Sequence, residues 1–174
     1  ISSPVINYNV SMGNTAWNLV QLGGFDNRTF MNSLACVKYY SLKDKEIPRL
    51  PYGYKEIGTK KEGKADYHIY ENSYALPLGY TYDSVLSEED LEKHTALERQ
   101  EIMLQAAAVA EPGKTSLKDA AALSSTSREA KITDYQAQGL KIEGNKAEIL
   151  KPGATLTLSF EGLEDSETYL VFDG

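Results

Sequence analysis

The chain has 174 residues, enough for one or two small domains, and 41% of them are hydrophobic, which supports a folded core. Its net charge of −7 at pH 7 disfavours nucleic acid as a partner, because an acidic surface repels phosphate. A single cysteine, Cys36, excludes an intrachain disulfide, and no apolar run approaches the roughly 18 residues that cross a bilayer. Since the chain opens at ISSPVINYNV without an initiator Met, we expect a fragment of a larger protein.

Residues 1–85 are rich in Tyr, Asn, Gly and Pro and predict a mixed part of strands and short helices. Helices are expected over 14–22 and about 27–34, the second capped by Asp26 with Phe30, Leu34 and Met31 facing inward. Strands are expected at 37–42, 65–71 and 78–83. The nearest approach to a basic stripe, formed by Lys60, Lys61 and Lys64, is expected in a solvated loop.

Residues 86–128 predict a helical insertion followed by a linker. Ser87 with Asp90, and Thr95 with Glu98, have the spacing of capping boxes, so two helices should start at these points. The second helix is expected over about 96–110, ended by Pro112-Gly113, and a small polar linker should follow.

Residues 129–174 predict an antiparallel β part. Strands are expected at 140–142, 147–149, 155–160 and 168–174, with turns at Gly144-Asn145 and Pro152-Gly153. This spacing is typical of a sandwich or jelly roll, which usually needs about seven or eight strands. Either earlier segments complete the sandwich, or it is truncated here. The whole chain is predicted to be α+β.

No pattern in the sequence predicts a reaction, a metal site or a cofactor. His68 and His94 are the only histidines, and neither has a partner at zinc-ligand spacing. The sequence lacks a nucleophile elbow, a triad signature and a phosphate-binding glycine loop. Its carboxylate runs, SEEDLE and GLEDSE, lie at predicted element boundaries, where helix capping and solvation explain them.

Carbohydrate binding is the one ligand chemistry that the composition favours. Sugars stack on aromatic faces and hydrogen-bond to planar amide and carboxylate groups. The candidate aromatic residues are Trp17, Tyr74 and Tyr80, with Asn72 and Asp83 as polar partners. The alternative is that the tyrosines fill a small sheet core.

The segment YENSYALPLGY, residues 70–80, is the densest in unusual residues. It is either a ligand site or a structural joint, and we favour the joint. In that interpretation Tyr70 ends a strand, Glu71 and Asn72 leave it, and Pro77 keeps Leu76 extended. Gly79 would then allow a close backbone approach.

Two segments carry a family resemblance. YENSYALPLGYTYDS and NRTFMNSLACVKYYSL, which contains Lys38 and Tyr39, resemble motifs of the YfhO family of bacterial membrane proteins. The spacing of the segments and the strand-rich tail with PGATLTLSFEGL fit as well, so the resemblance spans most of the chain. One departure is Cys36, at a position before VKY where the family often has glycine.

The resemblance implies a large membrane protein that looks like a lipid-phosphosugar-dependent glycosyltransferase. Its catalytic acids would lie on loops between membrane helices that this chain does not contain. The chain is then expected to be an extracytoplasmic, non-catalytic module. Its partners would be its own transmembrane region and a teichoic-acid-type glycan or lipid-linked sugar. The alternatives are a purely structural or protein-interaction domain and a soluble carbohydrate-active hydrolase.

Overall fold

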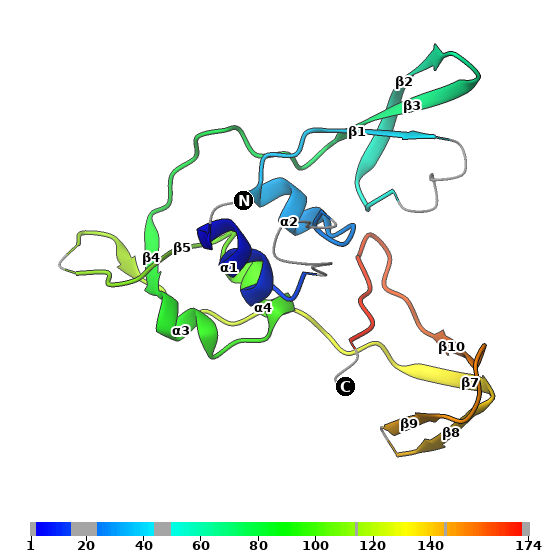
Figure 1. Ribbon diagram of the computed structural model, residues 1–174. Helices are drawn as coiled ribbons and strands as arrows, with labels where there is room; N and C mark the ends of the chain where they lie inside the picture. The colour runs from blue at the N-terminus through cyan, green and yellow to red at the C-terminus, as the bar shows by residue number, and fades with distance from the viewer. Residues whose placement is uncertain (1–2, 15–23, 44–49, 114, 145, 172–174) are drawn as a thin grey trace. The chain divides into compact units, whose positions relative to one another are not determined.

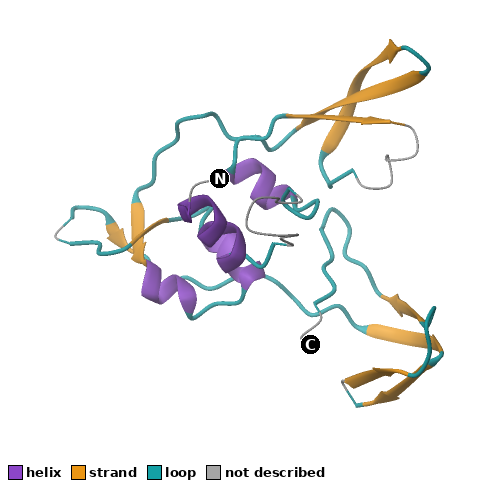
Figure 2. Cartoon of the chain, viewed as in Figure 1, coloured by secondary structure: helices purple, strands orange, loops and turns teal. Residues whose placement is uncertain are grey.

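The computed structural model describes residues 3–14, 24–43, 50–113, 115–144 and 146–171 (Figure 1). The chain divides into two compact units, Ile1–Thr126 and Ser127–Gly174. The described helices belong to the first unit, whereas the described part of the second unit is strand and loop (Figure 2). The predicted α+β class is confirmed, since these helices occur beside antiparallel sheets.

Two short helices open the first unit. Helix α1 spans Ser3–Ser11 and was not predicted, and α2 spans Thr29–Leu34 as expected. Met31 and Leu34 of α2 are buried, but Phe30 is 38% exposed, so its predicted inward direction is wrong. The N-cap is Arg28 rather than Asp26, because Asp26 and Asn27 form a turn with positive φ angles of 50° and 59°. The predicted helix at 14–22 lies almost wholly outside the described residues.

A three-stranded antiparallel sheet follows, in the order β1-β3-β2 (Figure 1). Strand β1 spans Tyr39–Lys43 and β3 spans Ala65–Asn72, close to the predicted ranges. Strand β2, Tyr54–Glu62, was missed, and Lys60 and Lys61 lie in it rather than in a loop. Its side chains are mostly exposed, so no apolar alternation marks it, and its ladder with β3 defines it instead.

The strand predicted at 78–83 is wrong. These residues are loop in the described chain, with the Asp83 carbonyl accepting from Lys118 N at 2.9 Å, and the next strand is β4, Ser84–Ser87. The alternating tyrosines have another role here. Tyr80 Oη donates to the Leu34 carbonyl at 3.1 Å, and Tyr82 Oη donates to the Met103 carbonyl at 2.5 Å. These two hydrogen bonds fix the loop of residues 78–83 to Leu34 and to Met103.

The two predicted capping boxes start helices as expected. Ser87 caps α3, Glu88–Glu92, by accepting a hydrogen bond from Asp90 N at 3.0 Å. Thr95 caps α4, Ala96–Ile102, by accepting from Glu98 N at 3.3 Å, while Glu98 Oε2 accepts from Thr95 N at 2.8 Å. Both interactions are local, which explains why the sequence revealed them.

Helix α4 ends at Ile102, not near 110 as predicted. The alanine-rich stretch after it forms β5, Ala107–Val109, which pairs in parallel with β4. The other edge of β4 pairs in parallel with β6, Lys118–Asp119. Tertiary packing overrides helix propensity here, because this small sheet covers a core. The buried residues of that core are Leu86, Leu91, Ile102, Ala106 and Ala120.

The second unit contains two antiparallel ladders. Strand β7, Ile132–Gln138, pairs with β10, Thr155–Phe160, and β8, Leu140–Glu143, pairs with β9, Lys146–Ile149. Three of these strands were predicted and β7 was missed. Residues 168–171, expected to begin the last strand, are irregular. The antiparallel pairing is confirmed, and a stacked sandwich stays a prediction.

Candidate functional site

The two motif segments are joined in the first unit by the pairing of β1 with β3. The backbone N–H of Asn72 donates to the Lys38 carbonyl at 2.8 Å, and Tyr39 lies opposite Glu71 in the ladder. The Lys38 ammonium is 3.2 Å from Glu71 Oε1 and lies 5.3 Å from the centroid of the Tyr39 ring. The two motif segments therefore meet in one antiparallel strand pair, β1 with β3.

Asn72 holds this joint together. Its side chain is buried, and its Nδ2 lies 3.3 Å from both the Ser33 hydroxyl and the Val37 carbonyl, to which it donates. Its Oδ1 accepts from the Tyr74 N–H at 2.9 Å. Asn72 was proposed from the sequence both as a sugar partner and as part of the joint. This geometry commits its amide to the joint.

The rest of the joint is only partly as expected. Tyr70 does not end its strand as predicted, because β3 continues through Glu71 to Asn72. Tyr70 is buried, Leu76 is half-buried, and Cys36 Sγ donates to the Pro77 carbonyl at 3.0 Å. The close approach predicted at Gly79 is wrong, because a Cβ added there would meet no atom within 4 Å.

The close approach occurs at Gly53 instead. Its φ is +76°, and an added Cβ would lie 2.4 Å from the Tyr74 ring. That ring stacks on Tyr52, with centroids 6.2 Å apart and planes at 15°. Tyr74 is 54% exposed, so it is a surface aromatic that packs over a backbone turn.

Cys36 lies in the left-handed region, with φ of +58°. Residues other than glycine are strained in this region, because their Cβ approaches the following carbonyl oxygen. This conformation gives a physical reason for a glycine at the position. The departure noted in the sequence therefore places a side chain at a strained backbone conformation.

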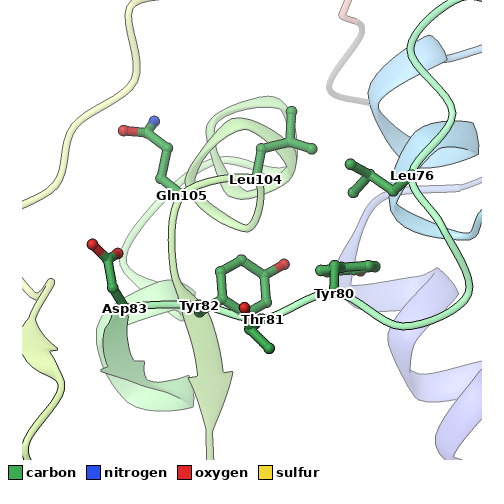
Figure 3. Close-up of a pocket in the computed structure, with 7 residues that line it drawn as sticks. All are labelled: Leu76, Tyr80, Thr81, Tyr82, Asp83, Leu104 and Gln105. Carbon is green, nitrogen blue, oxygen red and sulfur yellow. The ribbon is translucent and has the colours of Figure 1, made fainter.

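A surface pocket of about 400 Å³ lies beside the joint (Figure 3). Tyr80 and Asp83, two of the predicted ligand residues, line it, whereas Asn72 and Tyr74 do not. Trp17 lies outside the described residues. The full lining consists of Leu76, Tyr80, Thr81, Tyr82, Asp83, Leu104 and Gln105.

Sequence reasoning missed Thr81, Leu104 and Gln105. The last two were expected inside a helix, and they reach the pocket because α4 ends at Ile102. A weak signal did exist in the alternating tyrosines of 80–82. These rings meet edge to face, with centroids 5.5 Å apart and planes at 78°.

Two titratable groups of the pocket, Asp83 and Tyr82, have shifted pKa values. The Ser84 hydroxyl, and after it the Lys118 ammonium 3.5 Å away, hold the pKa of the Asp83 carboxyl below its usual range. Burial, and after it the neighbouring Tyr80, raises the pKa of the Tyr82 phenol. Asp83 is therefore an anionic acceptor and Tyr82 a neutral phenol, and neither is tuned as an acid–base catalyst.

A second polar cluster lies on the sheet. His68 Nδ1 is 3.0 Å from Glu56 Oε1 and 3.5 Å from the Thr59 hydroxyl. In a catalytic triad the hydroxyl and the carboxylate use different ring nitrogens. Here both approach Nδ1, so the cluster does not have the geometry of a triad.

The described residues contain no group of three or more His, Cys, Asp or Glu side chains that could hold a metal ion. No helix among them is long and apolar enough to span a membrane.

The fold and the pocket define an α+β module with an aromatic surface pocket. The model of the family described as bacterial membrane protein YfhO matches residues 2–174. The chain therefore belongs to the YfhO family, and the resemblance seen in its two motif segments is confirmed.

One relative is the uncharacterized protein YfhO of Bacillus subtilis (strain 168), to which the chain is 35% identical over 89 residues. The match covers 51% of this chain and 10% of the relative, so the chain spans only a small part of that protein. No solved structure matches.

Proposed function

We propose that the chain is a non-catalytic, extracytoplasmic module of a glycosyltransferase-like bacterial membrane protein. It would hold a cell-envelope glycan of the teichoic-acid type, or a lipid-linked sugar, for the protein's own transmembrane region. The observation that carries this proposal is the pocket that Tyr80, Asp83 and Gln105 all line (Figure 3).

The chemistry of the lining suits a sugar. Tyr80 is 37% exposed and offers an aromatic face, while Leu76 and Leu104 add aliphatic wall. The ionised Asp83 accepts hydrogen bonds from hydroxyls, and the Gln105 amide can both donate and accept. A volume of about 400 Å³ lies at the lower end of the range of about 300–1,000 Å³ for small-molecule sites.

The lining does not favour a hydrolase. Glycosidases usually use two carboxyl groups placed about 5–10 Å apart, one of them with a raised pKa. Asp83 is the one carboxylate among the lining residues, and its pKa is lowered. A soluble hydrolase therefore has less support than a binding module.

A structural or protein-interaction domain is the competing function. It is favoured by the polar groups already used inside the fold, namely the Asn72 amide and the hydroxyls of Tyr80 and Tyr82. The two functions differ in whether the pocket takes up a ligand at all.

Titration of the chain with teichoic-acid fragments and simple oligosaccharides, followed by NMR shifts, tests the proposal. We expect shifts at Tyr80, Asp83 and Gln105, with a dissociation constant of roughly micromolar to millimolar. Weak binding suffices for a module tethered to its enzyme, where effective concentrations are about millimolar.

Matched variants locate the site. Asp83→Asn should weaken binding about tenfold by removing a charged acceptor, whereas Asp66→Asn, on the exposed part of β3, should not. No shift at millimolar ligand, or equal weakening by both variants, would favour the structural domain. Turnover of a glycoside or lipid-phosphosugar by the chain, lost on a point substitution within it, would contradict the non-catalytic function.

A further inference from the structure

The charge of this acidic chain is unevenly distributed. Residues 38–72, which include the three-stranded sheet, contain eight lysines and arginines and six aspartates and glutamates. This segment has a net charge of +2 in a chain whose total is −7. Such an asymmetry suggests a surface for an anionic partner.

Strand register places lysines from both edge strands on one face of the sheet. Lys43 of β1 and Lys60 of β2 lie opposite Tyr67 of the central strand, from either side. Lys55 of β2 lies opposite Glu71 in the same way. Directly opposed side chains share a face, and in β3 residues 67 and 71 are separated by an even step.

Lys38 completes the set. It lies just before β1, and its ammonium reaches Glu71 Oε1 at 3.2 Å, so it comes to the same side. We call the resulting surface the lysine face and define it by Lys38, Tyr39, Lys43, Lys55, Lys60 and Tyr67. The sheet is at the upper right of Figure 1.

The lysine face combines exposed cations with aromatic rings. All four lysines are exposed, and Tyr39 is 54% exposed. The Lys43 ammonium lies 5.5 Å from the centroid of the Tyr67 ring, as Lys38 lies beside Tyr39. The same register places Glu62 and Glu71 on the lysine face, so its four lysines exceed its carboxylates by two. The opposite face has Lys61 opposite Asp66, and Glu56 paired with His68.

These residue types are the ones found where proteins touch lipid headgroups. Lysine stems lie along apolar surface while their ammonium groups bind phosphate, and tyrosine rings prefer the membrane–water interface. Anionic lipids attract basic segments near the bilayer. The chain belongs to a family of bacterial membrane proteins, so a bilayer surface is available as a partner.

We propose that the lysine face contacts the anionic headgroups of the membrane that holds the rest of the protein. A soluble polyanion is disfavoured because tyrosines beside the lysines suit an interface between water and hydrocarbon. The contact would orient the sheet on the bilayer. It is independent of whether the pocket binds a sugar.

Sedimentation of the chain with lipid vesicles tests this contact. We expect binding to vesicles that contain phosphatidylglycerol, little binding to pure phosphatidylcholine, and a decline as salt is added. Lys55→Glu with Lys60→Glu should lower binding about tenfold or more. The control is Lys61→Glu with Lys64→Glu, which makes the same charge change on the opposite face and in the turn.

Several results would overturn the proposal. These are binding that ignores phosphatidylglycerol, an equal loss in both double variants, or binding to polyphosphate as tight as to the vesicles. The last would identify a soluble polyanion as the partner. Because Glu at 55 would face Glu71, a second variant with Gln at both positions separates lost binding from lost folding, and circular dichroism checks the fold of each.

Discussion

Residues 70–74 and 79–83 lie in one short stretch of chain, yet they behave oppositely. The first part is built into the fold, with Tyr70 and Asn72 buried and the Asn72 amide fully engaged. The second part is a loop with Tyr80 and Asp83 at the surface of a pocket. We therefore assign the joint to the first part and keep the ligand site as a proposal for the second. Substitutions in the joint should change stability, and those at the pocket should change binding.

The largest effect is expected at Asn72. Asn72→Ala should lower the free energy of unfolding by about 2–4 kcal/mol, because it removes the hydrogen bonds of a buried amide to Ser33, Val37 and Tyr74. Urea denaturation measures this change. Ser73→Ala, at an exposed neighbour, is the control and should be nearly neutral. A mild effect of Asn72→Ala would mean that the joint is not what holds the two motifs together.

The next effect concerns two glycines. Gly53→Val should cost about 1–3 kcal/mol, because the new side chain meets the Tyr74 ring and φ is +76°. Gly79→Val should stay within about 0.5 kcal/mol, since it meets open space. Thermal unfolding of both variants tests this order. A larger loss of stability in Gly79→Val than in Gly53→Val would mean that the close approach lies at Gly79.

A smaller effect is expected at Cys36. Cys36→Gly should be more stable than Cys36→Ala by about 0.5–1 kcal/mol, because only glycine adopts a φ of +58° without strain. Both variants lose the sulfur contact with Pro77, so their difference isolates the backbone. Equal urea midpoints would show that the positive φ is not a source of strain.

The smallest change in stability is expected at Asp83. Asp83→Asn should leave the urea midpoint at neutral pH almost unchanged, because the carboxylate is exposed. Its lowered folded pKa means that the ionised form slightly favours folding above the unfolded pKa, and that this contribution is lost as pH falls through the folded pKa. A clear loss of stability in the variant would place Asp83 in the joint rather than in the pocket.

Local chemistry determined much of this structure from the sequence alone. Ser87 and Thr95 start helices because each cap binds a backbone N–H three residues away. The strands around Gly144 and Pro152 follow from alternation and turn residues. The family motifs were likewise visible as contiguous residues, without any knowledge of their contacts.

Tertiary structure decided the remaining features, because they depend on residues far apart in the chain. The alanines after Ile102 became a strand only because β4 offered a partner. The Tyr80 and Tyr82 hydroxyls bind carbonyls 46 and 21 residues away, which turned an apparent strand into the pocket loop. The lysine face has the same origin, since no basic stripe exists in the sequence and strand register alone brings Lys43 and Lys60 to either side of Tyr67. Register is set by the hydrophobic pattern and by turn geometry, and the mostly exposed sequence of β2 specifies it weakly by itself.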